Sequence, residues 1–116
     1  MVRKLMPLLL LAVAACSGRG PEADLQYIKQ ARTAAAEWAL VNEQARQGKL
    51  SGAYVASMHQ WLRQELQSAS AALTVPNARY AIEIHALLKQ PDDAPPQELR
   101  AHAAVLKQIE DQLESA

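Results

Sequence analysis

The feature of this sequence that most constrains the fold is the regular spacing of its apolar residues. Within residues 24–47, apolar side chains recur every three or four positions, as Tyr27, Ala31, Ala34, Trp38, Val41 and Ala45. This period matches the turn of an α-helix and places these side chains on one face. Because several of them are alanine, we expect the helix to approach its neighbours closely.

Three further stretches show the same period, and each is bounded by residues that start or stop helices. Residues 51–73 follow a short break at Gly48 and begin with Ser51, which suits a helix N-cap. Residues 76–89 and 96–114 are separated by a proline-rich segment. Their apolar series are, in chain order, Val55, Met58, Leu62, Leu66, Ala69 and Leu73; Ala81, Ile84, Leu87 and Leu88; and Leu99, Leu106, Ile109 and Leu113.

These stretches predict an all-α fold, a small bundle of four amphipathic helices over residues 24–116. The short break between the first two makes them antiparallel neighbours. The alternative is a three-helix bundle in which residues 76–89 form a partly irregular connector. The core is modest for a chain of this size, so a homodimer that buries more surface is a second alternative.

The first 16 residues follow a different pattern. Arg3 and Lys4 precede an apolar run over residues 5–16, which is shorter than the roughly 20 apolar residues that a membrane-spanning helix needs. A basic head, an apolar middle and small residues before a cut site are the parts of a secretory signal peptide. One interpretation is an ordinary cleaved signal peptide with Cys16 as a chance neighbour.

The run Val13-Ala14-Ala15-Cys16 resembles the lipobox of bacterial lipoproteins. The resemblance implies that the Cys16 sulfur receives a diacylglycerol, that the signal is cut between Ala15 and Cys16, and that the new amino terminus is acylated. These covalent lipids are the only cofactor that we expect. The chain then divides into a signal peptide at 1–15, a lipidated cysteine with a flexible tether at 16–23, and a helical domain at 24–116.

Ser17 bears on the destination that the resemblance implies. In Gram-negative lipoproteins an aspartate after the lipidated cysteine favours retention in the inner membrane. Ser17 therefore implies the periplasmic face of the outer membrane, with the inner membrane as the less favoured alternative. Two or three acyl chains anchor stably because each buried methylene contributes about 0.8 kcal/mol.

Charge and cysteine content exclude several classes of protein. Loss of residues 1–15 removes Arg3 and Lys4, which lowers the Lys plus Arg count from 12 to 10 against 12 Asp plus Glu, a formal net charge of −2. A chain with this balance and no basic stripe is not expected to bind nucleic acid. Cys16 is the only cysteine, so the domain has no internal disulfide and packing alone must hold it together.

The sequence shows no arrangement of residues typical of catalysis. Its histidines do not form an H-E-x-x-H pattern, and no serine lies in a G-x-S-x-G turn. Glu98 and His102 lie four positions apart, a spacing that suits either a ligand pair or a surface pair on one helix. We predict the surface pair, no metal site and no enzymatic activity.

Trp38 and Trp61 are the two candidate residues for a partner or ligand surface. Both lie on or beside apolar stripes, which favours core packing, whereas exposed tryptophans often anchor interfaces. We predict a non-enzymatic interaction or accessory module that contacts an unidentified envelope protein. The alternative is a carrier that binds a small apolar molecule between its helices.

Overall fold

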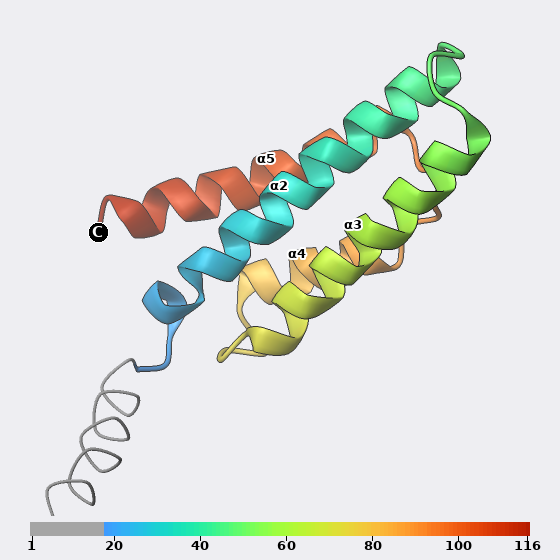
Figure 1. Cartoon of the computed structure of the whole chain (residues 1–116). Helices are drawn as coiled ribbons and strands as arrows, with labels where there is room; N and C mark the ends of the chain where they lie inside the picture. Colours follow the sequence, from blue (N-terminus) through green and yellow to red (C-terminus); the bar gives the residue numbers. More distant parts are fainter. Residues whose placement is uncertain (1–17) are drawn as a thin grey trace, which may run out of the picture.

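The computed structural model describes residues 18–116, and within them the chain forms four helices and no strand (Figure 1). The helices are α2 at Pro21–Arg46, α3 at Gly52–Ala72, α4 at Arg79–Leu88 and α5 at Pro96–Glu114. The all-α, four-helix prediction is confirmed. The predictions of a signal peptide, of cleavage between Ala15 and Cys16 and of lipidation at Cys16 lie outside the described residues.

Helix α2 is the central element of the bundle. It contacts α5 along one side and α3 along the other, while α4 packs against α3 and α5 (Figure 1). Ion pairs show that α2 and α5 are antiparallel, because Lys29 pairs with Glu114 near one end and Glu43 pairs with Arg100 near the other. None of these four helices is long and apolar enough to cross a membrane.

The core lies where α2 meets the other three helices. Its buried apolar side chains include Ile28, Ala31, Ala35, Trp38, Leu62, Leu66, Ala69, Tyr80, Ala81, Ile84, Leu87, Leu99, Ala103, Leu106 and Ile109. Most of the predicted apolar series are therefore buried. In α2 the buried face is rotated slightly from the predicted one, so that Tyr27 and Ala45 are only half-buried.

Two helix starts differ from the sequence prediction, and proline chemistry explains both. Helix α2 begins at Pro21 instead of Asp24, because a proline in the first helical position has a suitable φ and lacks only an N–H that would be unpaired there. Helix α4 begins at Arg79 instead of Pro76. Pro76 occupies the second position of a turn, closed by the Ala78 N–H donating to Val75 O at 3.3 Å.

The link between α2 and α3 follows the prediction. Gly48 has a φ of +70°, which favours glycine, and its N–H donates to Ala45 O at 3.0 Å to close the end of α2. Ser51 caps α3, since its Oγ accepts from the Tyr54 N–H at 3.2 Å. Helix α2 ends at Arg46 and α3 begins at Gly52, so the link between them is short.

Candidate functional site

A buried carboxylate lies at the end of the bundle where the described chain begins. Asp24 in the first turn of α2 is fully buried and accepts hydrogen bonds from Tyr80 Oη at 2.6 Å and Thr74 Oγ1 at 2.9 Å. The backbone N–H groups of Thr74 and Val75 also donate to it. Gly20 N–H donates to Thr74 Oγ1 at 2.9 Å, which ties the chain ahead of α2 to the same cluster.

The hydrogen bonds around Asp24 decide its charge state. Burial raises the pKa of the Asp24 carboxyl, but the donors Tyr80, Thr74 and Val75 outweigh burial and leave that pKa below its usual range. Burial and the neighbouring carboxylate raise the pKa of Tyr80 in turn. The cluster therefore holds an ionised aspartate against a neutral tyrosine and fixes the turn between α3 and α4 on the start of α2.

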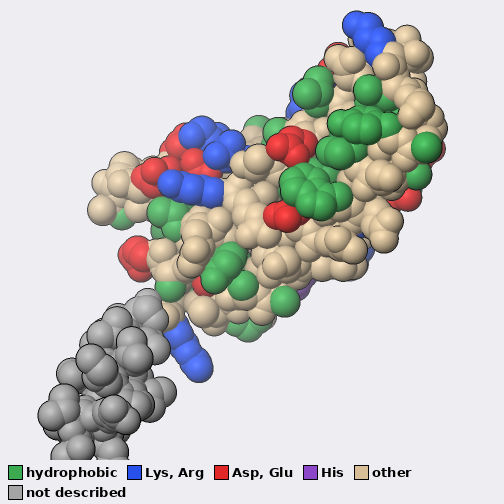
Figure 2. Space-filling model, viewed as in Figure 1, with side chains coloured by type: hydrophobic (Ala, Val, Ile, Leu, Met, Phe, Trp, Pro, Cys, Tyr) green, Lys and Arg blue, Asp and Glu red, His purple; other side chains and the backbone are tan. Residues whose placement is uncertain are grey.

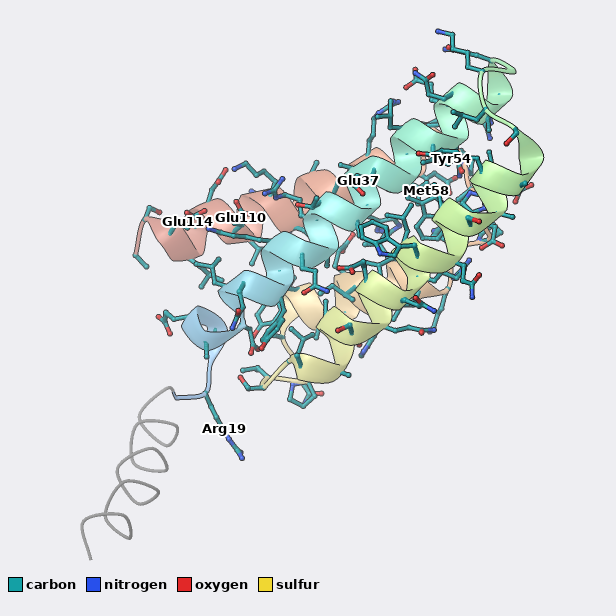
Figure 3. All side chains as sticks on the ribbon, in the orientation of Figure 1. Arg19, Glu37, Tyr54, Met58, Glu110 and Glu114 are labelled. Atoms are coloured by element: carbon teal, nitrogen blue, oxygen red, sulfur yellow. The ribbon has the colours of Figure 1, made fainter. Side chains whose placement is uncertain are left out.

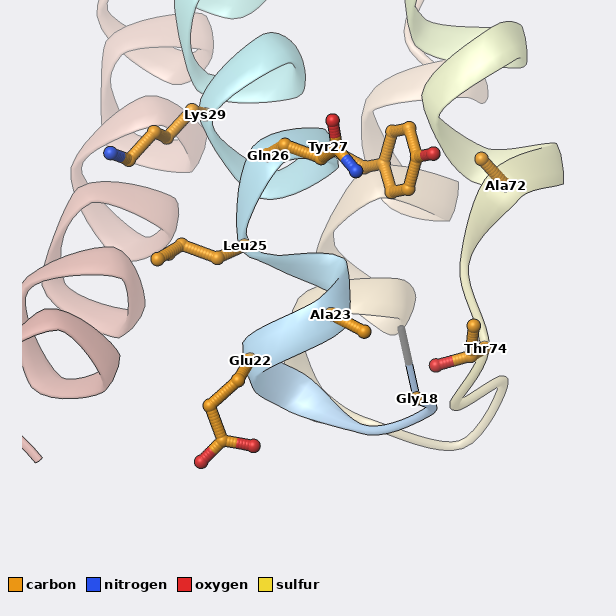
Figure 4. A pocket seen from close by; sticks show the side chains of 9 residues that line it. All are labelled: Gly18, Glu22, Ala23, Leu25, Gln26, Tyr27, Lys29, Ala72 and Thr74. Atoms are coloured by element: carbon orange, nitrogen blue, oxygen red, sulfur yellow. The ribbon is translucent and has the colours of Figure 1, made fainter. Parts of the chain in front are cut away.

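A surface depression of about 490 Å³ lies beside this cluster (Figure 4). Its lining includes Glu22, Tyr27, Lys29 and Thr74. Figure 4 shows Glu22 and Lys29 pointing away from one another, while the Tyr27 ring points toward α3. These side chains therefore do not converge on one point in the depression.

A second polar cluster lies at the opposite end, where α2 and α3 meet the loop between α4 and α5. The buried Asn42 donates from Nδ2 to Asp92 O and Ala94 O, each at 2.9 Å, and Trp38 Nε1 also donates to Asp92 O at 2.9 Å. Because Nδ2 faces two carbonyls, Asn42 Oδ1 is the acceptor for His59 Nε2 at 2.7 Å. The amide thus holds the loop in place.

Arg63 completes this second cluster from α3. Its Nε donates to Asp92 Oδ1 at 2.7 Å, and its two terminal nitrogens donate to Leu88 O and Gln90 O. The guanidinium carbon also lies 5.0 Å from the centre of the Trp38 ring, within range of a cation–π contact. Three of its five N–H donors are thus bonded to the loop, so Arg63 holds the loop against α3.

Three ion pairs join α2 to α5, and we call them the α2–α5 ladder: Lys29–Glu114, Arg32–Glu110 and Glu43–Arg100. Oxygens of Glu110, Asp111 and Glu114 lie within 4.8 Å of one another, a grouping that could hold a metal ion. Each already has a cationic partner: Arg32 and Lys107 for Glu110, Lys107 for Asp111, and Lys29 for Glu114. Burial raises the pKa of Glu110, but Arg32 and Lys107 outweigh it and lower that pKa. The grouping is thus a network of ion pairs.

His102 does not pair with Glu98 as the sequence spacing suggested. Its Nδ1 lies 2.5 Å from Glu83 Oε1 of α4, and its Nε2 lies 3.4 Å from the side-chain nitrogen of Gln90. The spacing within α5 placed Glu98 and His102 on neighbouring turns, but α4 packs against α5 and supplies the closer carboxylate. The pair links two helices and is not supplemented by further ligands in the described part of the chain.

The two tryptophans differ in how far they are buried. Trp38 is 1% exposed and belongs to the core, whereas Trp61 is 47% exposed on α3. They therefore do not form one aromatic patch, and Trp38 is unsuited to the partner surface that we considered for it. Trp61 lies on the α2–α3 face of the bundle with Tyr54, which is 50% exposed. Figure 2 shows hydrophobic side chains gathered on this face beside acidic groups.

Asp24 and Asn42 are buried, which was not predicted from the sequence. Both lie on the helical period of the buried side chains Ile28, Ala31 and Ala35. A polar residue at a position where the period demands an apolar one is the signal that could have identified them. No such signal marked Glu37, because its proximity to Trp61 depends on how α2 and α3 pack, whereas Glu65 follows Trp61 by one helical turn on α3.

Comparison with protein-family models, with curated proteins and with solved structures finds no match for this chain. Its class therefore rests on the fold and on its sites. The described residues form an all-α bundle whose buried polar groups hold its ends together. Within residues 18–116, the face between α2 and α3 combines the exposed side chains of Tyr54 and Trp61 with two carboxylates, Glu37 and Glu65, that form no ion pair there.

Proposed function

We propose that this chain is a lipid-anchored protein of the bacterial envelope, whose helical bundle binds another envelope protein and catalyses no reaction. The observation that carries the anchor is the run from Val13 to Cys16 behind a basic, apolar leader. Its position relative to α2 agrees with this proposal. Helix α2 begins at Pro21, so residues 17–20 alone join Cys16 to the bundle.

The short segment 17–20 restricts how the bundle is oriented relative to the membrane in this proposal. Four residues reach at most about 14 Å when fully extended, so an anchor at Cys16 would keep the start of α2 close to the membrane. The hydrogen bond from Gly20 N–H to Thr74 Oγ1 supports this proposal, because it ties the join to the turn after α3. The link between α2 and α3 then lies at the end of the bundle away from the membrane (Figure 1).

The support for a binding role is the exposed α2–α3 face. Tyr54 and Trp61 are each about half exposed, and half-exposed aromatic side chains are enriched among residues that anchor protein interfaces. The depressions on the described surface are open to solvent and lined by mixed polar and apolar side chains. They give the alternative of an apolar-molecule carrier less support.

Metabolic labelling with a palmitate analogue tests the anchor. We expect the wild-type chain to incorporate label, Cys16→Ser to lose it, and Ser17→Ala to retain it as the matched control. Label that survives in Cys16→Ser, or a mature amino terminus at another residue, would overturn the anchor. Membrane fractionation then tests the destination: wild type should fractionate with the outer membrane and Ser17→Asp with the inner membrane.

Site-specific photo-cross-linking in cells tests the binding role. A photoreactive amino acid at position 61 should give a discrete adduct with one envelope protein, because this face is proposed to be covered by a partner. The same group at Gln108, exposed on α5, is the matched control and should give none. Equal adducts at both positions, or none at position 61, would contradict the proposal.

A further inference from the structure

Helix α3 carries an apolar row at the edge of its core-facing side, and the two share Met58, which packs against the core. Tyr54, Met58 and Trp61 are spaced by four and three positions, which places them along one face of the helix. Tyr54 is 50% exposed and Trp61 47% exposed, while Met58 is half-buried. Figure 3 shows Tyr54 and Met58 on α3, on the side of the bundle where Glu37 projects from α2. A partner can therefore reach this row from solvent.

A surface cavity of about 240 Å³, open to solvent, lies between α2 and α3 at the Trp61 end of this row. Trp61 and Glu65 line it from α3, and Gln30, Thr33 and Glu37 line it from α2. Neither Glu37 nor Glu65 forms an ion pair within residues 18–116. Gln30 Nε2 donates to Glu65 Oε2 at 3.0 Å and so holds that carboxylate at the cavity.

The cavity has one cationic side chain in its lining, and that side chain is directed elsewhere. Lys29 contributes to the lining, but its Nζ lies 3.4 Å from Glu114 of α5. Two carboxylates thus remain without a cation beside a half-exposed indole. A cation can gain from both, through the negative face of the tryptophan ring and through charge-assisted hydrogen bonds to the carboxylates.

The two carboxylates also determine which kind of partner this face can bind. A second copy of this chain docking by the same face would bring Glu37 and Glu65 against the same carboxylates, which opposes a symmetric contact. An anionic lipid surface would likewise be repelled. A protein segment with a basic residue beside apolar ones fits both the cavity and the row that runs away from it.

From this geometry we propose that the α2–α3 face binds a basic amphipathic segment of a partner protein. A lysine or arginine of the partner occupies the cavity between Glu37, Glu65 and Trp61. Apolar residues of the same segment cover Met58 and Tyr54. This inference rests on the proposed binding role but not on the lipid anchor, so labelling of Cys16 and binding at this face succeed or fail separately.

Selection from a random 16-residue peptide library tests the proposal, with the full chain immobilised through its carboxy terminus as bait, so that the test does not depend on the lipid anchor. We expect the enriched peptides to carry Lys or Arg flanked by apolar residues. Trp61→Ala, and separately the double variant Glu37→Gln with Glu65→Gln, should each weaken an enriched peptide by about 10-fold. The double variant leaves every apolar side chain in place, so it carries the test even where Trp61→Ala disturbs folding.

Two matched controls separate the site from general surface effects. Ile82→Ala removes another exposed apolar side chain, 62% exposed on α4, and Glu98→Gln removes another exposed carboxylate. Both should bind the selected peptides as wild type does. The proposal is overturned if no peptide is enriched, if enriched peptides lack basic residues, or if the double variant binds them unchanged. A dimer in sedimentation that Trp61→Ala dissolves would show that a second copy covers the face, and would also overturn it.

Discussion

Helix α2 is held to its neighbours by two different kinds of polar contact. On the side of α5, the contacts are ion pairs: Lys29–Glu114 and Glu43–Arg100 lie at the surface, and Arg32–Glu110 is partly buried. On the side of α3 and α4, they are hydrogen bonds to two buried residues, Asp24 and Asn42, one toward each end of the helix. Solvent competes for the first kind and is excluded from the second. Burial, and not the number of charges, should therefore decide how much each contact contributes to stability.

The strongest test of this comparison is Asp24→Ala. The substitution leaves the buried Tyr80 hydroxyl and the part-buried Thr74 and Val75 N–H groups without their acceptor, and should lower the free energy of unfolding by about 4 kcal/mol. Urea unfolding followed by circular dichroism measures it. Glu22→Ala, an exposed acid in the same helical turn, is the control and should change stability by under about 0.5 kcal/mol. A loss below about 1 kcal/mol for Asp24→Ala would contradict the role given to burial.

The stability of the fold should also depend on pH through the buried carboxyl of Asp24. Because hydrogen bonds hold the pKa of folded Asp24 below its ordinary value of 3.8, the unfolded state takes up more protons as the pH falls toward and below that value. The contribution of Asp24 is thus present at neutral pH and lost in acid. Asp24→Asn should unfold with less dependence on pH than wild type below pH 3.8. Parallel pH profiles for the two proteins would disprove this assignment.

Asn42→Ala should have the second-largest effect. It removes the buried donor to Ala94 O, the part-buried donor to Asp92 O and the acceptor for His59. We expect a loss of about 2 kcal/mol in the free energy of unfolding, less than for Asp24 because no charge is involved. Thermal and urea melts measure it, with Gln44→Ala, half-buried on the same helix, as the control. Equal effects of the two substitutions would show that the amide does not fix the loop.

The sequence predicted the helices well and these buried contacts poorly, for a physical reason. Helix period, Ser51 and Gly48 are local signals, and they gave α3, α5 and the α2–α3 link within about two residues. The partners of Asp24 lie at Thr74, Val75 and Tyr80, and no local rule relates such distant positions. Both Asp24 and Asn42 interrupt a period of apolar residues, which indicates burial without revealing the partner.

The same limit applies to the candidate binding face. The spacing of apolar residues placed Trp61 beside a buried stripe, because a helical period cannot separate the edge of a core from an exposed row. Which side of α3 remains open depends on where α2 and α4 pack, and that is a property of the whole bundle. The exposure of Trp61 and the proximity of Glu37 to it could therefore be known only from the structure.

Glu110 is the buried carboxylate of the α2–α5 ladder, so it tests whether burial also strengthens an ion pair. Its side chain is 4% exposed, and Arg32 Nε lies 2.7 Å from its Oε1. Glu110→Gln keeps the shape and loses the charge, and should cost about 1 kcal/mol of stability. Asp111→Asn, which also meets Lys107 but is 58% exposed, is the matched control and should cost under about 0.5 kcal/mol. Equal losses would mean that burial does not distinguish the two carboxylates.

The smallest effects belong to the exposed pairs at the ends of the ladder. Lys29 and Glu114 are each 44% exposed and their charged atoms lie 3.4 Å apart, so Lys29→Met should lower the free energy of unfolding by about 0.3 kcal/mol. Salt screens such a pair, since the Debye length falls from about 10 Å at 0.1 M to about 3 Å at 1 M ionic strength. The difference between Lys29→Met and wild type should therefore vanish in 1 M NaCl, whereas the loss in Asp24→Ala should persist. If both losses vanish together in salt, the buried and exposed contacts on the two sides of α2 are not different in kind.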